Sequence, residues 1–351
     1  MTDLTTRYMG LKLRNPLIVA SSSLTGNLEG VRQASAAGAG AIVLKSLFEE
    51  QIAAETAALG QRASDAGHTE AAEYLQGYGM EMGPNDYLKL IKDAVVHSEV
   101  PIIASINCFS RSKWVDYAKR IEDAGAAALE LNIGLLPSSS GQLGRAIEER
   151  YYQILQEVKN HVRLPVALKV GPYFSSFGEV ASILGRDRAE APPFTVGWCG
   201  PGENPSRITW RKADALVLFN RFYRLDIDVD EMRLVAGNPL SSPDEINYSL
   251  RWIALLHKRI DSDLAATTGV HDGRDVVKQL LAGATAVQLC STLMQNGFEQ
   301  IGRILGELEA WMLKHNMQKL DDFRGRLSQY QSKTPADFER LQYIKVFVGL
   351  E

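Results

Sequence analysis

Two lysines follow short apolar runs, where an ammonium group needs an anionic partner. Lys45 ends the run AIVLK, and Lys169 lies within VALKVG. An unpaired ammonium is costly to remove from water, so each lysine requires a carboxylate or a ligand that carries negative charge. Two readings follow. The lysines form structural ion pairs with Glu49, Glu50 or Glu130, or they contact a bound group that gains negative charge during a reaction.

A second group of polar residues has the pattern of an anion-binding turn. In the segment ATTGVHDGRD, 266–275, Thr268 and Gly269 follow an apolar run, and a helix can begin within the same segment. Glycine lets the backbone approach an anion, and the free N–H groups of a helix N-terminus favour negative charge. The next apolar run leads to Ser291 and Thr292, which supply donors of the same kind. The pair of segments predicts a phosphate site.

The elements that would position these residues are buried parallel strands. Apolar runs rich in Val, Ile, Leu and Ala alternate with amphipathic, helix-like segments. Eight such runs begin at Asn15, Ala41, Ile102, Ala128, Val166, Ala215, Asp263 and Ala286. The helices between them are expected at 27–37, 112–124, 146–160, 243–259 and 273–281. Eight strand–helix units favour an α/β fold of the (β/α)₈ TIM-barrel type, formed as a single domain over residues 1–351.

The polar residues gather at the predicted strand ends. Active sites of such barrels lie at the carboxyl ends of the strands and in the loops that follow. In this sequence those positions are Ser21, Ser22, Lys45, Ser46, Asn107, Asn132, Lys169, Asn220, Thr268, Gly269 and Ser291. The two lysines and the anion-binding turn are therefore expected at one mouth of the barrel.

Three segments are longer than ordinary connections. Residues 50–85 and 221–242 follow strands and are expected to rise over the active-site face as a lid or substrate wall. Residues 185–212 follow a helix, which places them at the opposite face. The part from Met317 onward is predicted to be a helical appendage that closes against the barrel.

Composition excludes several classes of protein. The chain has 351 residues and a formal net charge of -4, which provides no general attraction for nucleic acid or anionic membranes. The three cysteines, Cys108, Cys199 and Cys290, form no CxxC pair, so we expect a reduced, cytoplasmic protein without a cysteine-based metal site. The beginning of the chain lacks a signal-peptide pattern, the uncharged stretch 279–298 is interrupted by polar residues, and the histidines show no metal-ligand spacing.

Several motifs in order resemble the dihydroorotate dehydrogenase family, particularly its soluble branch. They are NPLIVAS, VLKS, ELNI, ALKVGPYF, LFN, ATTGVHDGRD, LLAGATAVQL and DDFRGRLS, and they cover nearly the whole barrel. The resemblance implies an enzyme of pyrimidine metabolism that binds FMN and transfers a hydride from dihydroorotate, or a related small planar substrate, to the flavin N5. It implies a homodimer and the following FMN-binding residues: Ala20, Ser21, Lys45, Ser46, Asn132, Lys169, Thr268, Gly269, Val270, Ser291 and Thr292. Asn132 and Asn220 match the asparagines that face the substrate.

The sequence departs from the family at the catalytic base. The family places Cys or Ser three residues after the asparagine of the fourth strand, and Leu135 occupies that position here. Leucine cannot accept a proton. Pro137 replaces a further asparagine, and the substrate loop has become GYGMEMGPN, 77–85. The remaining candidates for the base are Ser138, Ser139 and Cys108.

Two other classes of protein stay open. A tRNA dihydrouridine synthase would share the FMN barrel, but that family requires a Cys-Pro after the asparagine and a basic surface, which this chain lacks. A non-catalytic flavoprotein or assembly subunit would explain the loss of the base.

Overall fold

The computed structural model describes residues 2–51, 83–108, 115–135, 138, 141–187, 210–221, 225–335 and 338. At residues 108, 115 and 116 it describes the backbone alone. Most of the predicted insertions 50–85 and 185–212 lies outside the described residues, as do Pro137, Ser139 and Cys199.

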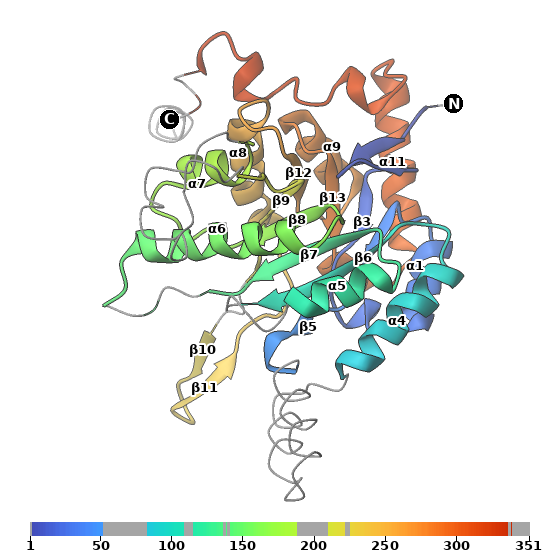
Figure 1. The fold of residues 1–351 in the computed structure, drawn as a ribbon. Helices are drawn as coiled ribbons and strands as arrows, with labels where there is room; N and C mark the ends of the chain where they lie inside the picture. Colours follow the sequence, from blue (N-terminus) through green and yellow to red (C-terminus); the bar gives the residue numbers. More distant parts are fainter. Residues whose placement is uncertain are drawn as a thin grey trace, which may run out of the picture.

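Eight parallel strands close into a barrel (Figure 1). They are β3 (Leu17–Val19), β4 (Ala41–Val43), β6 (Ile102–Cys108), β7 (Ala128–Ile133), β8 (Val166–Val170), β9 (Ala215–Leu218), β12 (Asp263–Ala266) and β13 (Ala286–Leu289). The pairing of β4 with β6 closes the ring, and the short β5 (Leu47–Phe48) extends it beside the carboxyl end of β6. Each strand begins within one of the eight apolar runs, and the predicted (β/α)₈ fold is confirmed.

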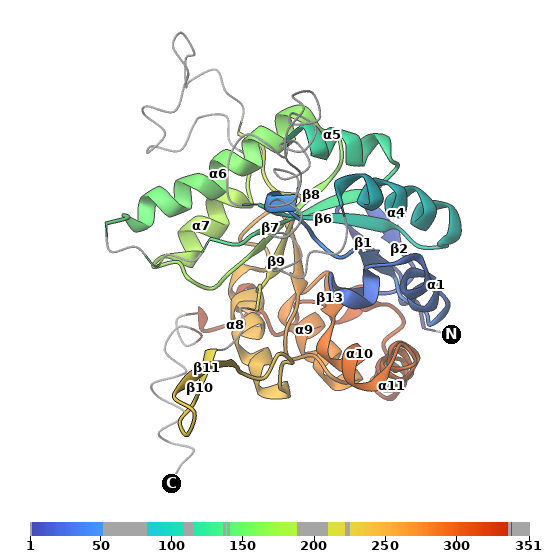
Figure 2. The same cartoon turned by 90° about the horizontal axis from the view of Figure 1, so that it is seen from below.

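Helices surround the barrel, as Figure 2 shows from below. They are α1 (Leu28–Ala36), α4 (Pro84–His97), α5 (Val115–Asp123), α6 (Gly144–His161), α7 (Phe177–Leu184), α8 (Ile246–Leu256), α9 (Gly273–Ala282), α10 (Ser291–Asn296) and α11 (Gln300–Lys314). Local sequence sets several boundaries. The side chains of Asn27 and Asp272 cap α1 and α9, because each accepts a hydrogen bond from a backbone N–H of the first turn. The helix predicted at 243–259 instead begins with a 3₁₀ turn, η3 (Pro243–Glu245).

The core has two layers. Large aliphatic and aromatic residues pack between the strands and the helices. Small residues such as Ala128, Ala167 and Ala265 fill the barrel interior, where opposing strands leave little room. A hairpin of β1 (Thr6–Tyr8) and β2 (Leu11–Leu13) places Tyr8 and Leu13, each at most 1% exposed, against this interior cluster and closes the amino-terminal end.

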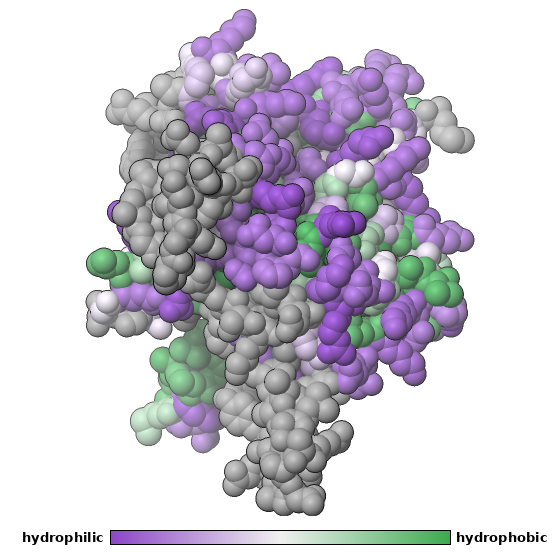
Figure 3. All heavy atoms as spheres, in the orientation of Figure 1, coloured by the Kyte–Doolittle hydropathy of each residue, from purple (hydrophilic) through white to green (hydrophobic). Residues whose placement is uncertain are grey.

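The insertion at 221–242 contains a hairpin that the sequence analysis did not identify. Strands β10 (Leu225–Asp228) and β11 (Arg233–Ala236) pair in antiparallel fashion and extend from the rest of the fold (Figure 1). Leu225, Ile227 and Leu234 are exposed, and Figure 3 shows apolar surface at this hairpin.

Residues 317–334 of the C-terminal appendage form turns and bends in place of the predicted helix, and the structure describes helical backbone only at Pro335 and Phe338. Two 3₁₀ turns, η4 (Leu320–Asp322) and η5 (Gln329–Gln331), flank a segment that docks on α9 through backbone hydrogen bonds to Leu280 and Leu281. No helix of the described residues is long and apolar enough to cross a membrane.

Candidate functional site

Two asparagines meet at the carboxyl end of the barrel. Asn132 lies in β7 and Asn220 follows β9, and Asn220 Nδ2 donates a hydrogen bond of 2.8 Å to Asn132 Oδ1. The backbone N–H of Asn220 donates to the carbonyl of Val170, at the end of β8 between them. Both side chains are half-buried. The mouth of the barrel therefore presents a pair of oriented amides, as predicted from the strand ends.

Lys169 emerges from β8 into a buried polar network. Its side chain is 10% exposed, and its Nζ lies 3.4 Å from Gln288 Oε1 and 3.9 Å from Glu130 Oε1. Gln288 Nε2 in turn donates to Glu130 Oε2 at 2.5 Å. Among the three carboxylates considered from the sequence, Glu130 is the one that lies beside Lys169. The distance of 3.9 Å is beyond hydrogen-bond length, so the ammonium keeps donor capacity.

Lys45 has a different environment at the end of β4. It is half-buried and forms no ion pair with any residue that the structure describes. Its side chain runs past Gly26, where a Cβ would lie 3.2 Å from Lys45 Cδ. The absence of a side chain at Gly26 leaves room for this lysine.

Ser46, next to Lys45 in the sequence, connects two other serine hydroxyls. Ser46 Oγ is 3.0 Å from Ser21 Oγ and 2.7 Å from Ser105 Oγ. The hydroxyl of Tyr87 bonds both backbone groups of Ser105, and burial raises the pKa of this phenol well above its usual value. Ser105 was not a candidate because it lies inside β6 and not at its end.

The predicted anion-binding turn follows β12. Thr268 and Gly269 have φ angles of +72° and +76°, so the backbone turns through two consecutive left-handed residues. A Cβ at Gly269 would lie 2.2 Å from the backbone nitrogen of Ile246. Only glycine fits there, because both the backbone conformation and the space exclude a side chain.

Ser241 joins this turn to the loop after β13. Its Oγ accepts a hydrogen bond of 3.3 Å from Gly269 N, and its own N–H donates to Ser291 Oγ at 2.9 Å. Thr292 Oγ1 donates to the carbonyl of His271. Ser241 therefore forms hydrogen bonds with both predicted phosphate-binding segments. The sequence analysis missed Ser241, which lies near the end of the insertion 221–242, just before η3.

Arg221 fixes the loop that carries Ser241. Its guanidinium pairs with Glu245 at 2.9 Å and donates to the carbonyl oxygens of Pro239 and Leu240. These contacts connect the end of β9 to the start of α8.

The structure places a hydrophobic side chain at the position of the family's base. Leu135 is half-buried and packs against the apolar core. Ser138 is exposed, Cys108 ends β6, and Ser139 lies outside the described residues. Cys290 lies at the same end of the barrel, but burial raises the pKa of its thiol, which disfavours the thiolate. The identity of a base stays a prediction.

The fold and the site define a (β/α)₈-barrel protein with two oriented amides, two lysines and the turns at Thr268–Gly269 and Ser291–Thr292 at its carboxyl-terminal mouth. No family model matches the chain. The chain is 24% identical over 332 residues to the catalytic subunit of dihydroorotate dehydrogenase B (NAD(+)) of Thermoplasma volcanium, covering 93% of this chain and 98% of the relative. It is 26% identical over 336 residues to the protein of the same name from Methanothermobacter thermautotrophicus, covering 92% and 97%.

Another relative has a different name. The chloroplastic dihydropyrimidine dehydrogenase (NADP(+)) of Arabidopsis thaliana is 23% identical over 363 residues, covering 93% of this chain and 78% of the relative. The matches span nearly the whole barrel, in agreement with the motifs found in the sequence. Over nearly its whole length the chain is thus similar to proteins named as dihydroorotate dehydrogenase catalytic subunits.

Proposed function

We propose that the protein is an FMN-dependent oxidoreductase that acts on the CH–CH bond of dihydroorotate or of a related small planar substrate. The observation that carries the proposal is the convergence of Lys45, Lys169 and the two anion-binding turns at one mouth of the barrel. The names of the relatives, which are dehydrogenases of dihydropyrimidines, favour an enzyme over a non-catalytic assembly subunit.

The residues present fit the phosphate of FMN. Gly269 and Val270 supply backbone N–H groups, Ser291 supplies a hydroxyl, and Ser291 and Thr292 supply backbone N–H groups at the start of α10. The hydrogen bond from Gly269 N to Ser241 Oγ is long, at 3.3 Å, so this N–H can turn to a stronger acceptor. Such donors suit a single terminal phosphate.

The lysines fit the ring of the cofactor. FMN, when bound, supplies an acceptor for hydride. Lys169 and Lys45 would stabilise the negative charge of the reduced ring. The carboxylate of Glu130, 3.9 Å from Lys169 Nζ, would partly offset the charge of Lys169 and so weaken this stabilisation. Ala20 and Ser21 would contact the cofactor from the end of β3, with Ser46 behind Ser21.

The asparagines would bind the substrate. Asn220 donates to Asn132, which leaves the second N–H of Asn220 and both N–H groups of Asn132 for ring carbonyls or a carboxylate. This arrangement recognises a planar molecule with acceptors at its edge. Since Leu135 supplies no proton acceptor, we infer that the substrate is not dihydroorotate itself or that a serine near 138 serves as the base.

The names of two relatives also indicate that those proteins have partner subunits. Both are catalytic subunits of NAD(+)-linked enzymes. We propose that this chain likewise passes electrons to a separate subunit, and a homodimer of the chain stays a prediction.

Anaerobic reduction of the bound flavin tests the proposal. Purified protein is mixed with dihydroorotate, dihydrouracil and other small dihydropyrimidines, and the flavin absorbance is followed. We expect one of these compounds to bleach the flavin at catalytic rates. If none does so, while dithionite does, the oxidoreductase assignment to this substrate class fails.

A further inference from the structure

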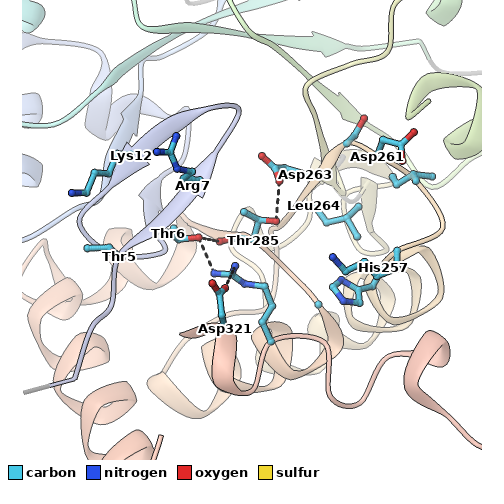
Figure 4. A pocket seen from close by; sticks show the side chains of 15 residues that line it. Thr5, Thr6, Arg7, Lys12, His257, Asp261, Asp263, Leu264, Thr285 and Asp321 are labelled. Atoms are coloured by element: carbon cyan, nitrogen blue, oxygen red, sulfur yellow. Dashed lines mark hydrogen bonds and ion pairs between the residues drawn. The ribbon is translucent and has the colours of Figure 1, made fainter. Parts of the chain in front are cut away.

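A cavity of about 670 Å³ lies at the end of the barrel opposite to the candidate site (Figure 4). The β1–β2 hairpin, the amino ends of β12 and β13, and the turn after α8 surround it. In Figure 4, Arg7 and Lys12 lie on one side and His257 on the other, with Asp263 between them. Nothing in the proposed oxidoreductase chemistry uses these residues.

Two of the cations stand in an unfavourable arrangement. Arg7 and Lys12 are directly opposite each other in the β1–β2 pair. Like charges at this position repel, because cross-strand side chains lie on the same face at short distance. Neither forms an ion pair with a residue of the described part of the chain, whereas Arg324, at the same cavity, pairs with Asp321 at 2.7 Å.

A third cation has a strained backbone. Lys258 follows α8 with a φ of +62°, in the left-handed region where glycine or asparagine is favoured. Its side chain lines the cavity and has no ion-pair partner among the described residues. Because lysine gains nothing from this backbone conformation, its presence here indicates that the side chain has a function.

The acids of the cavity offset these cations only in part. Asp321 is occupied by Arg324. Asp263 accepts hydrogen bonds from Met9 N at 2.7 Å and from Thr285 Oγ1 at 3.4 Å, and burial raises the pKa of its carboxyl. The described lining therefore holds four cationic side chains, Arg7, Lys12, Lys258 and Arg324, against three carboxyl groups, Asp261, Asp263 and Asp321.

We propose that this cavity binds a small polyanion with phosphate or carboxylate groups, contacted by Arg7, Lys12 and Lys258. Such a ligand relieves the repulsion between Arg7 and Lys12 and provides the partner that Lys258 lacks. Guanidinium and ammonium groups bind both kinds of oxyanion. The volume lies within the range of small-molecule sites, roughly 300 to 1,000 Å³. The proposal is independent of the reaction at the other end of the barrel.

Calorimetric titration of the full-length protein tests the proposal, with inorganic pyrophosphate and citrate as probes at constant ionic strength. We expect saturable binding of at least one probe, which also shows whether phosphate or carboxylate is preferred. Arg7→Gln and Lys258→Gly are each expected to weaken binding by about tenfold or more, because each removes a charge-assisted contact. Lys89→Gln, a change of an exposed lysine on α4, serves as the matched control and leaves binding unchanged.

Stability in the absence of ligand separates a binding role from a structural one. Glycine accepts the φ of Lys258 without strain, so Lys258→Gly should raise the midpoint of thermal unfolding while it weakens binding. The absence of saturable binding by either probe, or binding that both cavity variants leave intact, would overturn the proposal. The latter result would assign the anion to the turns at the opposite mouth.

Discussion

Asn220 and Asn132 are joined by a hydrogen bond of 2.8 Å, although they are 88 residues apart in the sequence. The bond fixes which amide edge each side chain presents at the mouth of the barrel, because Asn132 Oδ1 is used as the acceptor. The pair thus forms a rigid element of the proposed substrate site.

Loss of this bond should impair substrate binding more than flavin binding. Asn220→Ala removes one substrate contact and frees the Asn132 side chain to rotate, so KM for the reducing substrate should rise by about tenfold or more. The flavin content of the purified variant should stay at the wild-type level. Steady-state kinetics and flavin absorbance measure the two effects, and an equal loss of both would show that Asn220 supports the fold instead.

Lys169 should raise the reduction potential of the bound flavin. Replacement by Met removes a positive charge near the reduced ring, so the potential should fall by roughly 30 to 60 mV, equivalent to about 1.4 to 2.8 kcal/mol for two electrons. Lys89→Met provides the control for a charge change at a distance. An unchanged potential in Lys169→Met would mean that Glu130 already balances the lysine charge.

Leu135 should make dihydroorotate a poor reductant. General-base catalysis typically contributes about 10²- to 10⁴-fold, and leucine contributes none. We expect slow anaerobic bleaching of the flavin by dihydroorotate in stopped-flow experiments across a pH series. Leu135→Ser should increase the bleaching rate only modestly, because Pro137 and the 77–85 segment do not supply the side-chain amides that the family uses to bind the substrate. Fast bleaching by the native protein would identify another base, and substitution of Ser138, Ser139 and Cys108 in turn would locate it.

His257 should make stability depend on pH. Its ring lies between Gly283 and Gly325, where a Cβ would come within 2.4 Å and 2.2 Å of it, respectively. Burial, and then the charge of Lys258, lower the pKa of this imidazole below its ordinary value of 6.5. The folded state therefore holds His257 neutral while the unfolded chain takes up a proton, so stability is lost as the pH falls below 6.5.

Urea unfolding at pH 7.5 and pH 5.5 measures this dependence. His257→Gln should reduce the difference in unfolding free energy between the two pH values, whereas His97→Gln, at an exposed position on α4, should not. An NMR titration midpoint of His257 above 6.5 would contradict the assignment.

The strand pattern was predictable from the sequence, but several positions of the site were not. Eight apolar runs specify eight strands because strands buried on both faces have no polar alternation. Ser241 and Ser105 could not be predicted, because their roles depend on contacts between segments far apart in the sequence. Ser241 contacts Gly269, and Ser105 contacts Ser46. The alternation in LDIDVD is typical of a strand with one buried face, yet Leu225 and Ile227 are exposed, so the pattern alone does not show what covers them.

The cavity lined by Arg7, Lys12 and Lys258 could likewise not be predicted from the sequence. Arg7 and Lys12 are unremarkable surface residues until their register is known, and the left-handed conformation of Lys258 follows from the way α8 ends. The charge pattern arises only when β1, β2 and the turn after α8 are brought together.

Identification of the cofactor tests the central claim most directly. The purified protein is denatured, and the released chromophore is separated by chromatography and measured by fluorescence. The convergence of Gly269, Ser291 and Thr292 predicts release of FMN, which carries one terminal phosphate, in about equal amount to the chain. A colourless protein that does not take up added FMN, or release of FAD, would contradict the account.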